Sequence, residues 1–491
     1  MRNRSPKIHD DEDDDVFDHV QSADVADPPL PWKSLIVLTL LYVVQGLPTG
    51  LVMASLPFLL RARLSYSQLG IVSFASWPYA LKLLWSPIVD TKYVASFGRR
   101  KSWIVPMQLV IAGVMLALGE SIAPDLSTIG PDNASVYVFT LALFTIVLCA
   151  ATQDIAVDGL AIANGVLPVA HRGLASTTQS IGLNCGYFMS FTVFLAFNSA
   201  DFCNAWLRSP ENASSVGVLT LNMYCTFIAY CFFATTLYMA VFFREPAVSE
   251  SAADVSNMHA VYADILNIAK LKPVQELSLA MMTCKVGFVL FDAVTTLRLL
   301  DKGVRQQDVA VFALVDFPLQ LLVALYASKH AISSTPLALY RVGFFFRALV
   351  GVCGVLLVYL YPGGAPSTLW WLLLLLSSLA YSSASSLMFV SQCALFSRVA
   401  DESIAGTYVT FLNSVTNLGS SWPKFCVLIL VDVFAGWIGD GYFVLALFST
   451  LFNAGFFLRM MDRLLALQHV PASRWMLRDS STSSTTSGVA V

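Results

Sequence analysis

The chain has 491 residues, of which 56% are apolar and only 12% are charged. Soluble globular proteins average about 25% charged residues, so this composition lacks the polar surface that a water-soluble protein needs. Together with a mean hydropathy of +0.68, it excludes a soluble enzyme, a nucleic-acid-binding protein and a disordered chain. It indicates a helical membrane protein with many spans.

Residues 1–33 are predicted to be a disordered, cytosolic tail, because an acidic run makes them too polar to build a core. Apolar segments of about 20 residues, the length of a membrane span, follow one another after this tail. The predicted spans are 34–57, 67–88, 103–120, 135–157, 173–196, 218–243, 275–299, 308–327, 340–361, 368–393, 404–431 and 441–461. The predicted fold class is therefore an all-α membrane protein with 12 transmembrane helices.

The longest internal break, residues 244–274, divides the spans into two sets of six. We expect a short amphipathic helix near residues 261–271 of this cytosolic linker. Residues 34–243 then form the first half, residues 275–461 the second half, and the Ser/Thr-rich residues 462–491 a disordered cytosolic tail. Two six-helix halves, related as parallel repeats, are the major facilitator architecture.

Positively charged side chains predict the orientation of the chain. If both termini are cytosolic, the cytosolic segments and span ends hold 19 of the 29 Lys and Arg residues, and the opposite loops hold five. The sequons at Asn133 and Asn212 fall in those opposite loops, on the side where N-glycosylation occurs. We therefore predict cytosolic termini and glycosylation of both asparagines.

Spans five and eleven carry the clearest trace of a repeat. An offset of 233 residues aligns Gly186 with Gly419 and Asn184 with Asn417. Each span also has polar residues at i, i+3 and i+7, which places them on one face of an apolar helix. We expect Asn184, Asn413 and Asn417 to line a cavity between the halves.

Ionisable side chains inside apolar spans are costly and mark functional sites by default. Four such cations come from four different spans: Lys82, Lys285, Arg347 and Lys424. If they line one cavity, it suits a polyanion such as an organic phosphate. Asp292 lies two helical turns from Lys285 and is its expected partner. A purely structural ion pair is the alternative, above all for Lys82.

Two acidic residues of span four, Asp154 and Asp158, lie four apart on one helical face near its cytosolic end. Their like charges need a neutralising cation, and we expect Arg172 or Arg99 to supply it. Both carboxylates, like Asp292, are predicted gate or coupling residues.

The loop between spans two and three contains the run Gly98-Arg99-Arg100-Lys101, which follows Asp90. An acid followed by such a run resembles the major facilitator loop signature, although the spacing here is longer. In facilitators this loop braces the cytosolic gate through salt bridges and a helix-dipole contact. Asp90, Arg99 and Arg100 are therefore predicted gate residues, with positive-inside anchoring as the plainer interpretation.

Motifs for enzymatic chemistry are missing from the sequence. All six histidines lie outside the predicted spans, and no HExxH, GxSxG or Walker A motif occurs. The nine cysteines show no CxxC spacing. We therefore predict a protein that is not an enzyme and that needs no cofactor or metal.

Distinctive motifs lie in four stretches: Trp77-Pro78 to Val89-Asp90, FGRRKSW at 97–103, AATQDIAVDG at 150–159, and Gly406 to Trp422-Pro423. Together with residues 199–204, they resemble the acetyl-coenzyme A transporter family of the endoplasmic reticulum membrane. The resemblance covers most of residues 35–460 and neither tail. Bacterial muropeptide permeases carry something similar to the QDIAVDG run, so the FGRRKSW run and the stretch ending in Trp-Pro are more specific.

The resemblance implies import of cytosolic acetyl-CoA into the endoplasmic reticulum lumen by alternating access. It agrees with a cation-lined cavity, because CoA carries a phosphate monoester and a pyrophosphate. Exchange for free CoA, proton coupling, uncoupled transport and the oligomeric state all remain open. The alternatives are a facilitator for another anionic solute, such as a muropeptide-like glycoconjugate or a nucleotide sugar, and a membrane scaffold that does not transport.

Overall fold

A computed structural model describes residues 30–121, 129, 132–162, 167, 174–245, 258–331, 335–364, 366–400 and 405–477. All regular elements in these residues are helices. Nine of the described helices are long and apolar enough to cross a membrane. Predicted spans two and seven are each broken into three shorter helices, and the helix at span eight has a shorter apolar stretch, Leu314–Ala327. The count of twelve spans therefore stays a prediction.

The first half consists of α1 (Trp32–Gly50), α2 (Leu56–Arg61), α3 (Tyr66–Ser73), α4 (Trp77–Leu81), α5 (Ser86–Thr91), α6 (Lys101–Ser121), α7 (Asn133–Ile162), α8 (Leu174–Phe188), α9 (Leu195–Asn198), α10 (Ala200–Trp206) and α11 (Leu221–Leu237). A π-helical segment, Leu51–Ser55, joins α1 to α2 into one long span. It follows Pro48 inside α1, and proline removes a backbone donor from the helical ladder.

The second half consists of α13 (Lys272–Thr283), α14 (Val289–Ala293), α15 (Thr295–Asp301), α16 (Gln306–Ala331), α17 (Leu337–Tyr359), α18 (Thr368–Val399), α19 (Ala405–Ile438), α20 (Gly441–Arg459) and α21 (Met461–Ala466). Helix α12 (Met258–Lys270) lies between the two sets of helices and covers most of residues 261–271, where an amphipathic helix is expected. The Tyr262 hydroxyl on α12 donates to the Leu84 carbonyl oxygen at 2.7 Å, so the linker docks onto the first half.

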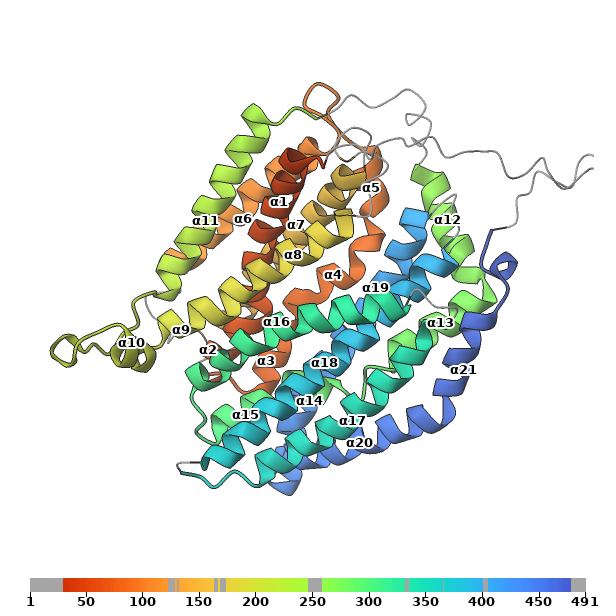
Figure 1. The fold of residues 1–491 in the computed structure, drawn as a ribbon. Coiled ribbons are helices and arrows are strands. Elements are labelled where there is room, and N and C mark those ends of the chain that lie inside the picture. Colours follow the sequence, from red (N-terminus) through yellow and green to blue (C-terminus); the bar gives the residue numbers. More distant parts are fainter. Residues whose placement is uncertain are drawn as a thin grey trace, which may run out of the picture.

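The two halves lie side by side, with the first half drawn in red to yellow-green and the second in green to blue (Figure 1). At the end that carries Trp32, each half has its own apolar core. At the opposite end one core continues across both halves and includes Leu51, Val289 and Leu428. The halves are therefore packed most continuously at the end away from the described termini.

The C-terminal segment differs from its prediction. The expectation of disorder from residue 462 is wrong for residues 462–477, which include part of α21 and two short 3-10 turns. Trp475 is 1% exposed in the core of the second half, and its carbonyl oxygen accepts a hydrogen bond from Tyr408. Burial of this large aromatic side chain stabilises the segment, so that it is ordered although its composition is polar. Residues 1–29 and 478–491 lie outside the described residues.

Candidate functional site

A buried ion pair links α7 to the broken second span. Lys82 lies on the 3-10 turn between α4 and α5, and its Nζ is 2.6 Å from Oδ2 of Asp154. Gln45 of α1 donates to the other carboxylate oxygen at 2.7 Å. Lys82 therefore neutralises Asp154, and the expectation that Arg99 does so is wrong, because Arg99 lies out in the loop. Arg172 lies outside the described residues.

Asp158, one turn further along α7, is bound by neutral donors. It accepts hydrogen bonds from the Tyr42 hydroxyl at 2.7 Å and from Gln179 Nε2 at 2.8 Å. No lysine or arginine in the described part of the chain forms an ion pair with it. Among the described residues, Lys82 is thus the cation that forms an ion pair with this acidic couple, and it does so through Asp154.

The loop between α5 and α6 is braced on three sides. Arg100 forms an ion pair with Asp90, with a nitrogen–oxygen distance of 2.6 Å, and Arg99 donates to the backbone carbonyl of Asp90 at 2.6 Å. Glu245 accepts the backbone N–H of Arg100 at 2.9 Å, which places a carboxylate at the positive end of α6. A Cβ at Gly159 of α7 would overlap the Arg100 guanidinium, so glycine there lets the loop approach α7.

Asp292 of α14 pairs with Arg347 of α17, not with Lys285. One guanidinium nitrogen of Arg347 lies 2.7 and 2.9 Å from the two carboxylate oxygens, and the Tyr381 hydroxyl donates to Asp292 at 2.8 Å. The expected Lys285–Asp292 pair is wrong because residues 284–288 form turns, not a continuous helix. The two-turn spacing therefore no longer places both side chains on one face.

Lys285 lies in this unwound segment of span seven. Its Nζ makes only long contacts, 3.4 Å each, to the Thr416 carbonyl and the Ser420 hydroxyl of α19. Asn453 of α20 donates to the freed carbonyl of Gly287 at 3.0 Å, so a side chain replaces the missing helical donor. Discontinuous helices of this kind line the binding sites of many transporters.

Lys424 of α19 has no hydrogen-bond or ion-pair partner in the described part of the chain. Together with Asp292 it lines a cavity between the halves, where about 660 Å³ of empty space includes open solvent. The first half contributes residues of span one and α3 to this inter-half cavity, including Val52 and Ser73. Lys424 is therefore a cation in the wall of this cavity that no described side chain pairs with.

Only three of the four predicted cations lie near one another. Lys285, Arg347 and Lys424 all lie within electrostatic range of Asp292. Lys82 is held in the first half by Asp154 and does not belong to this group. The second half alone therefore brings three cations around one carboxylate.

The three asparagines that were expected to line a cavity do not line the inter-half cavity. Asn184 is exposed on α8, and its amide donates to the Ser180 carbonyl on the same helix at 2.8 Å. Asn417 is exposed and Asn413 half-buried on α19. None of the three is among the side chains that line the inter-half cavity. The aligned glycines have a clearer role: Gly186 packs against Gly46 of α1, and Gly419 packs against the backbone of α13.

Contacts between the halves gather at the end away from Trp32. Arg61 at the end of α2 is 2.9 Å from Asp301 at the end of α15, and the Tyr66 hydroxyl donates to the same carboxylate at 2.7 Å. The backbone N–H of Ser67 donates to Asp432 of α19 at 2.6 Å. We call these contacts the closing network.

Both predicted glycosylation sites are exposed. Asn133 is the first residue of α7, and Asn212 ends the 3-10 turn Pro210–Asn212. The preceding spans place both on the same side as the closing network.

Several residues of these sites were not predicted from the sequence. They are neutral polar side chains inside apolar spans, namely Tyr42, Gln45, Gln179, Tyr381 and Ser420, and the acids Glu245, Asp301 and Asp432 at span ends. Glutamine inside an apolar span is a usable signal, because a buried amide needs partners. Tyrosine and serine are too common in spans to stand out.

Comparisons with known proteins agree with this architecture. A family model described as "Acetyl-coenzyme A transporter 1" matches residues 34–251, 246–341 and 333–439. An uncharacterized protein of Schizosaccharomyces pombe is 35% identical over 415 residues, which cover 84% of this chain and 77% of the relative. An uncharacterized membrane protein of Saccharomyces cerevisiae is 31% identical over 485 residues, covering 84% and 86%. The anhydromuropeptide permease of Escherichia coli is 28% identical over 155 residues, covering 31% and 29%.

Two solved transporter structures have a similar fold. The inward-open xylose transporter XylE of Escherichia coli superposes with a TM-score of 0.59 at 14% identity, covering 89% of this chain and 99% of that one. A bacterial homolog of the human lysosomal transporter Spinster, inward-facing and unoccupied, gives 0.57 at 15% identity, covering 91% and 96%. At these identities the likeness shows the fold alone. The chain is a multi-pass membrane protein with the major facilitator fold, and it belongs to the acetyl-coenzyme A transporter family.

Proposed function

We propose that the protein carries acetyl-CoA across the endoplasmic reticulum membrane, from the cytosol to the lumen, by alternating access. Both termini would then be cytosolic, as the distribution of Lys and Arg predicts. The description of the matching family supports acetyl-CoA as the substrate.

The observation that carries this proposal is Lys424, which lines a cavity between the halves and has no partner among the described residues. Lys285, in the neighbouring span, makes only long contacts with the described residues. A phosphate monoester carries about −1.5 to −2 charges at neutral pH, and CoA adds a pyrophosphate. Arg347 compensates Asp292, so the carboxylate does not cancel the two lysines. The phosphates would bind Lys424 at the cavity and Lys285 in the unwound segment of span seven.

The predicted gate residues would control access to the binding cavity. Asp90, Arg99 and Arg100 would hold the cytosolic loop in the observed state and release it when the halves rock. Asp154, which pairs with Lys82, and Asp158, which accepts from Tyr42, would act as coupling residues during transport. Proton coupling and exchange for free CoA are both compatible with this arrangement.

Uptake of labelled acetyl-CoA into proteoliposomes tests the proposal. We expect Lys424→Gln and Lys285→Gln to lower uptake about 10- to 100-fold each, the range expected for one charged hydrogen bond. Lys270→Gln, on the exposed face of linker helix α12, is the matched control and should transport normally. Stimulation by CoA inside the liposomes would identify exchange, and stimulation by a pH gradient would identify proton coupling.

A second candidate substrate is a muropeptide-like glycoconjugate, favoured by the similarity to anhydromuropeptide permease over about a third of the chain. Uptake of labelled anhydromuropeptide without any uptake of acetyl-CoA would replace the proposal with this alternative. Failure of the folded protein to bind or transport acetyl-CoA would contradict the proposal directly.

A further inference from the structure

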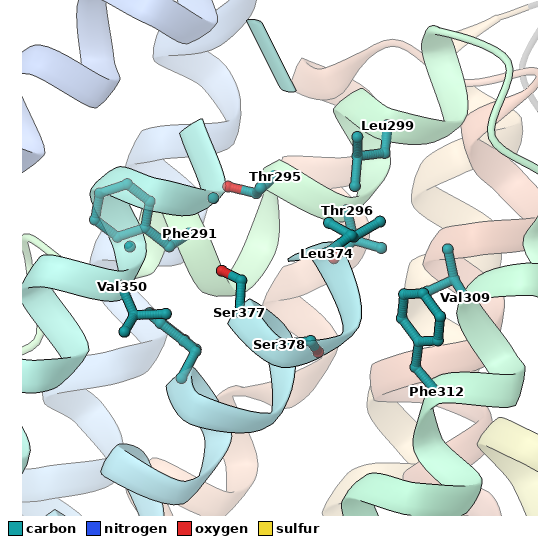
Figure 2. A pocket seen from close by; sticks show the side chains of 13 residues that line it. Phe291, Thr295, Thr296, Leu299, Val309, Phe312, Val350, Leu374, Ser377 and Ser378 are labelled. Atoms are coloured by element: carbon teal, nitrogen blue, oxygen red, sulfur yellow. The ribbon is translucent and has the colours of Figure 1, made fainter. Parts of the chain in front are cut away.

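A second cavity lies within the second half, beside the inter-half cavity. It lies between spans seven, eight, nine and ten, and its empty space of about 610 Å³ includes open solvent. Its wall combines the rings of Phe291 and Phe312 with the hydroxyl side chains of Thr296, Ser377 and Ser378 (Figure 2). We call this cavity the hydroxyl-lined pocket.

Three of its hydroxyl groups are not used by the protein. Thr296, Ser377 and Ser378 have no hydrogen-bond partner in the described part of the chain, whereas the neighbouring Thr295 is 3.0 Å from the Tyr442 hydroxyl. Polar groups at membrane depth need a partner, because lipid offers none. These hydroxyls are therefore available to a ligand or to water in the pocket.

The hydroxyl-lined pocket adjoins the inter-half cavity. Thr296 lines both spaces. Tyr381 lines the pocket, and its hydroxyl donates at 2.8 Å to Asp292, which lines the inter-half cavity. Thr296 and the Tyr381–Asp292 pair therefore form the wall that the two spaces share. A long ligand with its charged end at Lys424 would have to pass this wall to place its other end among the hydroxyl groups.

We propose that the hydroxyl-lined pocket receives the pantetheine arm and acyl group of a CoA thioester, which rests on the function proposed above. The arm carries two amides, a gem-dimethyl group and the thioester. Hydroxyl groups both donate and accept hydrogen bonds, so they match amide N–H and C=O groups alike. Phe291, Phe312 and Leu374 provide apolar contacts for the methyl and acyl groups. Affinity for the arm would thus come from the second half alone.

Gly354 offers a direct way to fill this pocket. It lines the pocket, and a Cβ added there would meet no heavy atom within 4 Å. Gly455 of α20 is a matched control, because its Cβ would also meet nothing within 4 Å and it does not line the pocket. Both glycines lie inside helices, so Gly354→Leu and Gly455→Leu change helix propensity in the same direction.

Binding to the purified full chain is measured with two probes, acetyl-CoA and 3′-phospho-ADP, which is CoA without its pantetheine arm. We expect Gly354→Leu to weaken acetyl-CoA binding by about tenfold or more and to leave 3′-phospho-ADP binding unchanged. Gly455→Leu should leave both unchanged. Thr296→Val removes one hydroxyl with little change in side-chain volume and should weaken acetyl-CoA binding several-fold. This second variant tests the pocket even if Gly354→Leu does not fold.

Unchanged acetyl-CoA binding in both Gly354→Leu and Thr296→Val would overturn the pocket assignment and leave the transport proposal intact. An equal loss of both probes in folded Gly354→Leu would also overturn it, because the effect would then not concern the arm. If the wild-type protein binds neither probe, the proposed function itself fails.

Discussion

At the scale of single residues, ion-pair partners decide which charges a ligand can reach. Asp292 holds Arg347, whose side chain is 8% exposed, whereas the Asp292 side chain is 41% exposed at the cavity. Lys424 has no such partner in the described residues. A substrate would therefore meet the lysines before it could displace the buried arginine.

The asymmetry of this pair leads to a stability prediction. Asp292→Ala leaves a buried guanidinium without its carboxylate and should cost about 3 kcal/mol in free energy of unfolding, the lower end for a broken buried pair. Arg347→Met should cost less, because the remaining carboxylate is partly exposed. The double variant should recover most of the loss, as measured by denaturation of the purified protein. Equal, small losses for both single variants would contradict a buried ion pair.

At the scale of elements, two glycines set how closely helices of each half approach. A Cβ at Gly186 would lie 2.7 Å from the Cα atom of Gly46, and a Cβ at Gly419 would lie 2.9 Å from the Cα atom of Met282. The repeat alignment of span five with span eleven thus corresponds to the same packing device: α8 on α1, and α19 on α13.

Alanine at these positions should push the helices apart. Gly186→Ala and Gly419→Ala should each lower the free energy of unfolding by about 1–3 kcal/mol, the usual cost of overpacking. Gly113 of α6 has open space around its Cβ position, so Gly113→Ala should be neutral or slightly stabilising. Thermal unfolding of the three variants in detergent checks this, and a Gly186→Ala protein as stable as Gly113→Ala would refute it.

At the scale of the whole molecule, the closing network ties the halves together at the end away from the described termini. Arg61 and Asp301 are 17% and 20% exposed, so their ion pair is only partly shielded from solvent. Together with the core shared by both halves at that end, it favours a state that is closed there.

Loss of this ion pair should shift the balance between access states. Asp301→Asn should raise the population open at that end about fivefold, equivalent to about 1 kcal/mol for a partly exposed pair. The measurement is labelling of Ser73→Cys, in the inter-half cavity, by an impermeant thiol reagent added from that side. Asp308→Asn disrupts only a local pair with Arg305 and serves as the control. Identical labelling of both variants would show that the network does not hold the halves closed.

Membrane orientation gives a second prediction at this scale. Asn133 and Asn212 are exposed on the side of the closing network, so both should carry glycans if that side is lumenal. Asn133→Gln and Asn212→Gln should each increase the electrophoretic mobility of protein from microsomes, and the double variant should be insensitive to glycosidase. Glycosidase sensitivity that persists in the double variant would contradict this topology.

The sequence by itself determined the helical class, because long apolar segments are a local property of the chain. It also singled out the ionisable residues inside the apolar spans as candidates. Only the tertiary structure decided how they pair: Asp154 with Lys82, 72 positions away, and Asp292 with Arg347, 55 positions away. The expected Lys285–Asp292 pair assumed an unbroken helix, and unwinding at residues 284–288 removes that periodicity. Partners so distant in sequence are brought together by helix packing, which no local pattern records.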